Sequence, residues 1–218
     1  MSSRDLLHNP CWQGKDLGHP LPDSTHAVSV ALPRWRDVIA YEDNDPQCRS
    51  QLRAFYPRFA LHPLVAEVAQ QALALIPTGM TSRGSSAWPF PNGTAAQLAQ
   101  NHCLQQAPSA STQIVDQLGL SVLIADAEAS PHAKAFWQHA GLGASSRRAA
   151  ISLSKEKAPA KGAADQAKAL VIERLAAIYG CDTQQLSLHP SGMAGLHTAL
   201  QWVTACLLYT SPSPRDRG

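Results

Sequence analysis

Two stretches of the chain repeat apolar residues at the spacing of an amphipathic helix. The first covers residues 64–75 and follows Pro63, a residue favoured at the first position of a helix. The second covers residues 165–179 and stops at Gly180, which suits a left-handed C-terminal cap. The apolar positions of these two predicted faces are Leu64, Val68, Ala72, Leu75, Ala167, Val171, Leu175 and Ile178.

Other patterns predict shorter elements between these helices. Thr94 is placed as the N-cap of a helix that starts with "AAQLAQNHCLQQA", and Ser130 with Pro131 begins another, "HAKAFWQHA". The compact apolar run "LSVLIADA", residues 120–127, predicts a buried strand. Pro and Gly punctuate residues 77–93, so that segment is predicted to be a loop.

The patterns divide the chain into four parts. Residues 1–63 hold one short alternation, Val28 to Val30, and are predicted to form an N-terminal arm. Residues 64–161 are helix-rich and end in a linker, while residues 162–205 begin an α/β domain. In that domain the strand "LSLH", residues 186–189, leads by a tight turn into a helix, which is the unit of α/β folds.

The fourth part, residues 206–218, breaks the helical pattern before it. Met193, Leu196, Leu200 and Val203 follow helical spacing, but the chain then continues as "CLLYTSPSPRDRG". Read as codons, this string resembles a transposase-end adapter from sequencing libraries, so we interpret it as an adapter translation and not as native sequence. The alternative is a natural Pro/Ser-rich C-terminal linker.

Composition narrows the functional class. Apolar residues make up 44% of the 218-residue chain, enough for a core, and the net charge of +2 comes without a long basic run, which disfavours nucleic-acid binding. The sequence shows no signal peptide and no apolar run of membrane-spanning length, so we expect a cytoplasmic protein that binds no membrane. Neither the scattered cysteines nor the histidines have metal-site spacing, and no metal is expected; they include Cys11, Cys48, Cys103, Cys181, Cys206, His102, His132 and His139.

Three short motifs offer groups that bind phosphate or carboxylate. In "SLHPSGMAGLHTAL", Ser191 and Gly192 place the amide groups of a helix N-terminus where an anion can approach them. The alternative for this turn is simple helix capping by Ser191. "PTGM", residues 77–80, spells a similar tetrapeptide but leads into Gly, Ser and Pro instead of a helix, so it is set aside.

The second and third motifs supply guanidinium groups. "AFWQHAGLGASSRRAA" places Arg147 and Arg148 after two glycines, and its alternative is a solvated basic loop. "AFYPRFALHP" places Tyr56 and Arg58 around a proline, and its alternative is a buried aromatic ring with an arginine extended along it.

Taken together, four segments in order resemble one enzyme family. "THAVSVALPRWRDVIAYED", "FYPRFALHP", "FWQHAGLGASSRRA" and "LHPSGMAGLHTAL" resemble the cystathionine γ-synthase-like branch of the pyridoxal-phosphate enzymes of Cys/Met metabolism, with a long N-terminal extension. The resemblance spans about residues 18 to 205. It implies a fold-type-I transferase (aspartate-aminotransferase-like) with an incomplete sheet, and a homodimer or homotetramer when complete. It also implies a transsulfuration role in methionine biosynthesis with a small amino-acid substrate.

The resemblance assigns cofactor-binding residues but no catalytic ones. It implies that Ser191, Gly192 and Met193 hold the phosphate of pyridoxal 5'-phosphate through backbone amides. The family's Tyr-x-Arg motif, which reaches the phosphate of the neighbouring subunit, falls on Ser145 and Arg147. A serine stands where the family has tyrosine, which puts the catalytic part of Ser145 in doubt. Tyr56 and Arg58 spell Tyr-x-Arg far upstream and are the reserve candidates, so the choice between Arg147 and Arg58 stays open.

The family's Schiff-base lysine and its pyridine-binding aspartate follow the Ser-Gly-Met helix, so they are expected beyond Ala205. Lysines that precede the turn are not assigned a catalytic role; they are Lys155, Lys157, Lys161 and Lys168. The chain by itself is therefore expected to be inactive. The parent reaction is expected to be γ-replacement on an activated homoserine ester by cysteine. A sulfhydrylase, a cystathionine lyase and a non-catalytic phosphate-binding or scaffold protein of the same fold are the alternatives.

Overall fold

The computed structural model describes residues 4–54, 56, 60–76, 84–160 and 162–210, the last four of these by their backbone alone. The chain divides into two compact units. The first consists of residues 1–138 and 144–156, and the second of residues 139–143 and 157–218. Each unit mixes helices with short strands or extended segments, and each is described by itself.

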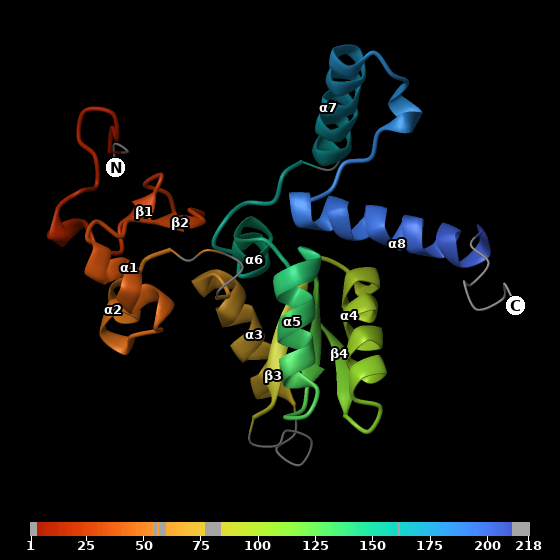
Figure 1. Ribbon diagram of the computed structural model, residues 1–218, viewed down its shortest axis with the longest axis horizontal. Coiled ribbons are helices and arrows are strands. Elements are labelled where there is room, and N and C mark those ends of the chain that lie inside the picture. Colours follow the sequence, from red (N-terminus) through yellow and green to blue (C-terminus); the bar gives the residue numbers. More distant parts are fainter. Residues whose placement is uncertain (1–3, 55, 57–59, 77–83, 161, 211–218) are drawn as a thin grey trace, which may run out of the picture. The chain divides into compact units, whose positions relative to one another are not determined.

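The first unit is built on a three-stranded antiparallel sheet (Figure 1). Its strands are β3 (Ser86–Phe90), β4 (Thr112–Gln117) and β5 (Leu120–Ala125), with β5 in the centre. The hairpin from β4 to β5 turns through Leu118 and Gly119, which both have positive φ, at 53° and 75°. A two-residue turn of this kind matches the twist of the strands that it joins.

Strand β5 confirms the predicted buried strand, and its side chains alternate between two helical layers. Leu120, Val122 and Ile124 join one core cluster with α3 (Pro63–Leu75) and with Ala149 of α6 (Ser146–Ser152). Helix α3 confirms the helix predicted over 64–75, with Pro63 at its start. Leu75 of the predicted apolar face is instead 69% exposed, because the helix ends there, beyond the edge of the core.

Helices α4 (Gly93–Gln106) and α5 (Ser130–Ala140) confirm two further predicted helices, and α4 packs against all three strands. The cap of α4 differs from the prediction: the Asn92 side chain, not that of Thr94, accepts the Ala95 N–H. An Asn side chain forms this bond as readily as a Thr, so the sequence left the choice of cap open.

The predicted loop over 77–93 is wrong for residues 86–90, which form edge strand β3. Its aromatic side chains are buried: Trp88 lies 5.3 Å from the Trp137 ring and Phe90 lies 6.2 Å from the Phe136 ring, measured between centroids. Pro89 is tolerated in β3 because an edge strand needs hydrogen bonds on one side only. The burial of two aromatic rings therefore outweighs the turn signal of the prolines.

The N-terminal arm has a small core of its own. It contains β1 (Pro20–Leu21), β2 (Ser29–Val30), α1 (Trp35–Glu42), α2 (Pro46–Gln51) and a short 3-10 helix, η1 (Gly14–Asp16). β2 confirms the predicted alternation and pairs antiparallel with β1. The arm core consists of Ala27, Val30, Tyr41, Cys48, Leu52 and Ala54, which are all buried.

The second unit is helical in its described part. Helix α7 (Ala163–Tyr179) confirms the predicted helix, and Gly180 caps it with φ at +63°. The short 3-10 helix η2 (Thr183–Gln185) and α8 (Gly192–Thr210) follow. The strand predicted over 186–189 is wrong, because no described strand pairs with this segment. Without a neighbouring strand its backbone has no ladder to join.

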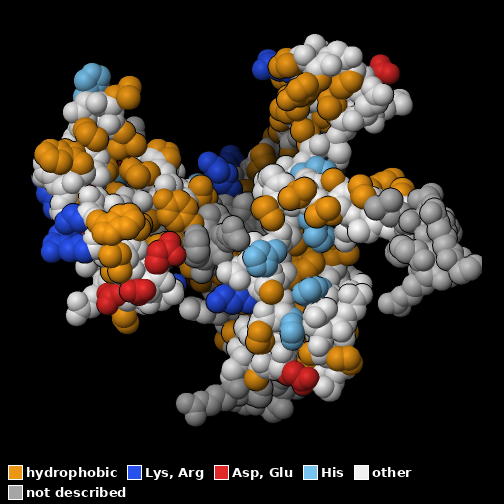
Figure 2. Space-filling model, in the orientation of Figure 1, with side chains coloured by type: hydrophobic (Ala, Val, Ile, Leu, Met, Phe, Trp, Pro, Cys, Tyr) orange, Lys and Arg blue, Asp and Glu red, His pale blue; other side chains and the backbone are white. Residues whose placement is uncertain are grey.

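Both long helices of the second unit expose apolar side chains. Figure 2 shows hydrophobic side chains gathered on the visible face of α7. The exposed set on the two helices includes Leu170, Val171, Ile178, Tyr179, Leu196, Leu200, Trp202 and Val203. Within the described residues, none of the helices has both the length and the apolar character required to cross a membrane.

Candidate cofactor-phosphate site

The Ser-Gly-Met turn begins helix α8 and is held by the Ser191 hydroxyl. Its Oγ accepts the Ala194 N–H at 3.1 Å and donates to the Gly141 carbonyl oxygen at 3.0 Å. The Ser191 carbonyl also accepts the Gly195 N–H, which starts the helical ladder. Ser191 thus caps the helix as the sequence predicts, and its second hydrogen bond ties the turn to a loop 50 residues earlier.

That loop is "GLG", residues 141–143, and its first glycine touches the turn directly. Gly141 has φ at +66°, and a Cβ built on it would lie 2.5 Å from Ser191 Oγ and 2.7 Å from Met193 Cβ. Only glycine fits such an approach. The structure therefore packs Gly141, from one of the segments that resemble the family, against the Ser-Gly-Met turn of another.

The outer side of the turn is open. A Cβ built on Gly192 meets no described atom within 4 Å, and the Met193 side chain is 45% exposed. The first amide groups of a helix have no partners inside the helix, and they carry the positive end of its dipole. The Gly192 and Met193 amides therefore fit a phosphate group, which needs close approach and N–H donors.

Ser145 and Arg147 lie in the first unit, at the start of α6. Ser145 is the N-cap of this helix, and its Oγ accepts the Arg148 N–H at 3.3 Å. Both Ser145 and Arg147 are exposed, so their side chains are accessible to a ligand. The sequence missed α6 because its first residues follow a Gly/Ser stretch that indicates a loop.

Tyr56 is partly buried and packs against the core of the arm. Its ring meets Tyr41 edge-on at 5.9 Å between centroids, and its hydroxyl accepts a hydrogen bond from Ser29 Oγ at 3.2 Å. These contacts favour the alternative of a buried aromatic ring at this position. Arg58 lies outside the described residues.

Other groups of the described part offer little chemistry. Burial raises the pKa of the Cys103 thiol to about 11, so this cysteine stays protonated and unreactive at neutral pH. Within residues 4–210, apart from the undescribed gaps, no three His, Cys, Asp or Glu side chains are grouped in a way that could hold a metal ion.

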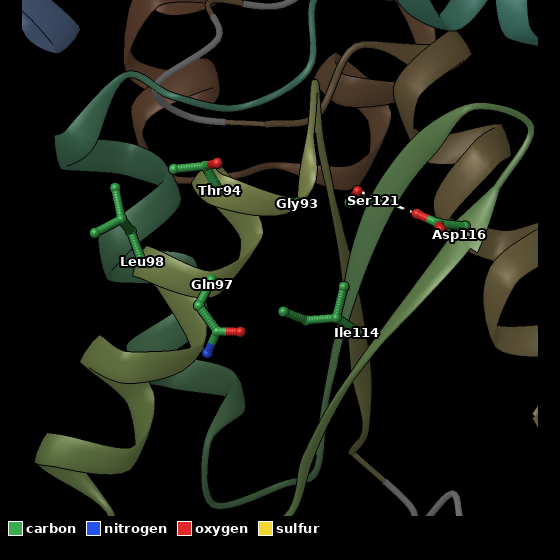
Figure 3. Close-up of a pocket in the computed structure, with 7 residues that line it drawn as sticks. All are labelled: Gly93, Thr94, Gln97, Leu98, Ile114, Asp116 and Ser121. Carbon is green, nitrogen blue, oxygen red and sulfur yellow. Dashed lines mark hydrogen bonds between the residues drawn. The ribbon is translucent and has the colours of Figure 1, made fainter.

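A shallow trough of about 590 Å³ lies between α4 and the sheet (Figure 3). Its residues come from three elements: Gly93, Thr94, Gln97, Leu98, Ile114, Asp116 and Ser121. The Ser121 hydroxyl donates to Asp116 Oδ1 at 3.2 Å within it. None of the predicted cofactor-binding residues that the structure describes lines this trough, and no sequence motif marks it.

Comparison with known proteins relates the chain to transsulfuration enzymes. Residues 64–145 match the family described as fungal trans-sulfuration enzyme, N-terminal domain. A cystathionine gamma-synthase of Neurospora crassa is 31% identical over 62% of this chain and 25% of its own length. A putative cystathionine gamma-synthase of Saccharomyces cerevisiae is 44% identical over 24% of this chain and 8% of its own length. The chain is cystathionine γ-synthase-like.

A further relative extends the similarity along this cystathionine γ-synthase-like chain. The L-2-amino-4-chloropent-4-enoate dechlorinase/desaturase of Streptantibioticus cattleyicolor is 31% identical over 85% of the chain and 37% of its own length. The chain thus spans between a quarter and two fifths of the first two relatives. No solved structure shows a significant match.

Proposed function

We propose that this chain is the N-terminal part of a pyridoxal-phosphate-dependent transsulfuration enzyme of fold type I. The reaction proposed for the complete protein is γ-replacement on an activated homoserine ester by cysteine. The observation that carries this proposal is the Ser-Gly-Met turn: it opens a long helix, Gly141 packs against it, and its outer amides are accessible. The relationship to cystathionine gamma-synthases supports the assignment.

Each residue of the turn has a separate task in this proposal. The amides of Gly192 and Met193 donate hydrogen bonds to the cofactor phosphate, and the helix dipole adds favourable electrostatics. Ser191 keeps its hydroxyl on the Ala194 amide and the Gly141 carbonyl, so it orients the turn. When bound, the cofactor withdraws electrons from the substrate α-carbon, which makes loss of the α-proton possible.

Arg147 is proposed to complete the phosphate site from a second subunit. A guanidinium group presents paired N–H donors that match a phosphate, and the exposed Arg147 side chain is free to be covered by a partner chain. Ser145 supports this role by capping α6, which carries Arg147. Since Ser145 lacks a phenol ring, it can offer a hydroxyl to the phosphate but no aromatic face to the substrate.

The substrate class is proposed to be an amino acid with a leaving group on its γ-carbon. The Streptantibioticus relative is named for an amino acid that carries chlorine on carbon 4, which is the γ-carbon. That name is compatible with γ-replacement and also with a lyase or a homoserine-ester sulfhydrylase. The products formed from O-acyl homoserine with cysteine, and then with sulfide, separate these reactions.

The gene itself tests whether the protein continues. We expect that amplifying the genomic locus past the codon for Ala205 with library-independent primers will yield an open reading frame in place of "CLLYTSPSPRDRG". That frame is expected to encode an aspartate and then a lysine that follows a strand. A genomic sequence that encodes these thirteen residues and then stops would contradict both the adapter interpretation and the enzyme proposal.

In the complete protein, Arg147→Ala is expected to raise the dissociation constant of the cofactor about tenfold or more, because a charge-assisted hydrogen bond is lost. Arg147→Lys is expected to restore part of the affinity, since it keeps the charge without the paired geometry. Absorbance of the bound cofactor during dialysis measures both. Arg36→Ala, at an exposed position of α1, is the matched control. Equal cofactor loss in the Arg36 and Arg147 variants would exclude the assignment.

A further inference from the structure

A histidine of the arm bridges two points around α6. His26 Nδ1 lies 3.0 Å from Ser146 Oγ, and Nε2 lies 2.5 Å from Glu156 Oε1. Its side chain is only 9% exposed. Ser146 is the first residue of α6 and Glu156 follows the end of that helix, so one imidazole contacts the segment on both sides. These residues all belong to the first unit.

A second histidine joins the arm to α3. His62 is the N-cap of α3: its Nδ1 accepts the Leu64 N–H at 3.2 Å. Its Nε2 lies 2.8 Å from the carbonyl oxygen of Thr25, the residue directly before His26. The two imidazole rings lie 6.3 Å apart between centroids. Histidine side chains therefore hold two adjacent arm residues: His62 contacts Thr25, and His26 contacts Ser146 and Glu156 through its own ring.

The partners determine where each ring carries its proton. A backbone carbonyl only accepts and a backbone N–H only donates, so His62 must be protonated on Nε2 and bare on Nδ1. The Glu156 carboxylate only accepts, so neutral His26 is also protonated on Nε2 and accepts the Ser146 hydroxyl on Nδ1. With both rings neutral, all four nitrogens have suitable partners.

A second proton on His62 is incompatible with one of its two hydrogen bonds. On His62 it places N–H against the Leu64 N–H, at the positive end of α3. Protonated His62 therefore loses its hydrogen bond with the Leu64 N–H. The charge on its ring would also lie close to the His26 ring.

We propose that His26 and His62 form a pH-sensitive clasp that holds the N-terminal arm against α3 and α6 and thereby positions the first turn of α6. That turn carries Ser145 and Arg147, so the last step rests on the proposed cofactor-binding function. The clasp itself does not depend on that function.

The charges around the clasp are consistent with this direction. Glu156 contacts His26, and the preceding residue, Lys155, forms an ion pair with Glu67 of α3. Arg147 and Arg148 directly follow Ser146 in the chain. Burial lowers the pKa of His62 below its ordinary value of 6.5; the hydrogen bond to the Thr25 carbonyl opposes this shift, and the neighbouring His26 adds to it. A lowered pKa in the folded state means that its contribution to stability is present above 6.5 and is lost as pH falls through the folded value.

The test is NMR of the whole chain with labelled histidines. At about pH 7.5, long-range proton–nitrogen spectra are expected to show His62 as the Nε2–H tautomer. Between about pH 7 and about pH 5, hydrogen-exchange protection of residues 25–31, corrected for intrinsic exchange, is expected to fall about tenfold or more as His62 is protonated. His132→Gln, on α5, is the control and should leave this transition unchanged.

Two variants separate the two bonds of His62. His62→Asn keeps an acceptor for the Leu64 N–H but cannot reach Thr25, so the arm should exchange rapidly at both pH values while the start of α3 stays protected. His62→Gln keeps a donor that reaches Thr25, so arm protection should become independent of pH. An Nδ1–H tautomer on His62, or an unaltered pH transition in both His62 variants, would overturn the clasp. Because no cofactor is used, either result is independent of the proposed enzyme activity.

Cofactor binding by the complete protein tests the positioning role separately. If the clasp positions α6 for cofactor binding, the cofactor affinity of His62→Asn should fall about threefold to tenfold, while His132→Gln should bind the cofactor with normal affinity. If the pH transition is observed by NMR but His62→Asn binds the cofactor with unchanged affinity, the clasp exists and has no role in positioning α6 for the cofactor.

Discussion

Gly141→Ala is expected to separate the 141–143 loop from the Ser-Gly-Met turn. Its new methyl group would lie 2.5 Å from Ser191 Oγ, 2.7 Å from Met193 Cβ and 2.8 Å from the Ala194 nitrogen. The left-handed backbone costs about 1–2 kcal/mol for a residue with a Cβ, and such overpacking costs about 1–3 kcal/mol more. Hydrogen exchange of the first turn of α8 measures the loss in the chain, and cofactor retention measures it in the complete protein.

Gly180→Ala is the matched control for this effect. Gly180 has nearly the same left-handed backbone, with φ at +63°, but a Cβ there meets no described atom within 4 Å. It therefore bears the backbone cost alone, and the Ser191 turn should keep its protection. If the two alanine variants lose protection at the Ser191 turn equally, the close packing of Gly141 has no role in holding that turn.

Leu123→Ala is expected to lower the free energy of unfolding of the first unit by roughly 2–5 kcal/mol. The Leu123 side chain is fully buried on the central strand, where its removal leaves a cavity as well as lost apolar contact. Urea denaturation followed by tryptophan fluorescence measures the change, since Trp88 and Trp137 lie in this unit.

Leu104→Ala, at a partly exposed position of α4, should cost less than about 1 kcal/mol and serves as the comparison. Hydrogen exchange of α7 should be unaltered by either substitution, because that helix belongs to the second unit. A similar loss for Leu104 and Leu123 would argue against β5 as the centre of the core.

Local patterns predicted the elements whose signals lie within one stretch of chain. Pro63 with its following apolar residues predicted α3, and Gly180 predicted the end of α7, since caps and periodicity act over a few residues. Strand β4 escaped prediction because Thr112–Gln117 mixes polar with apolar residues at an edge of the sheet. β4 forms because it pairs with β5, and the residues of β4 alone do not indicate that pairing.

In the second unit, the sequence predicted a helix correctly but not the burial of its apolar face. Periodicity correctly placed α7, yet Val171 and Ile178 of its predicted inner face are exposed. A periodic face indicates that a helix has a side suited to burial, but it does not indicate what covers that side. The described residues provide no full cover for it.

Residue types at short spacing were enough to predict the relationship to transsulfuration enzymes, the strongly periodic helices and the cap at the Ser-Gly-Met turn. The packing of Gly141 against Ser191, and the contact of His26 in the arm with Ser146 of α6, became visible only in the folded chain. These pairs are 50 and 120 residues apart, respectively. Contacts at such separations have no repeat or spacing in the sequence, since they arise only when separate elements pack together.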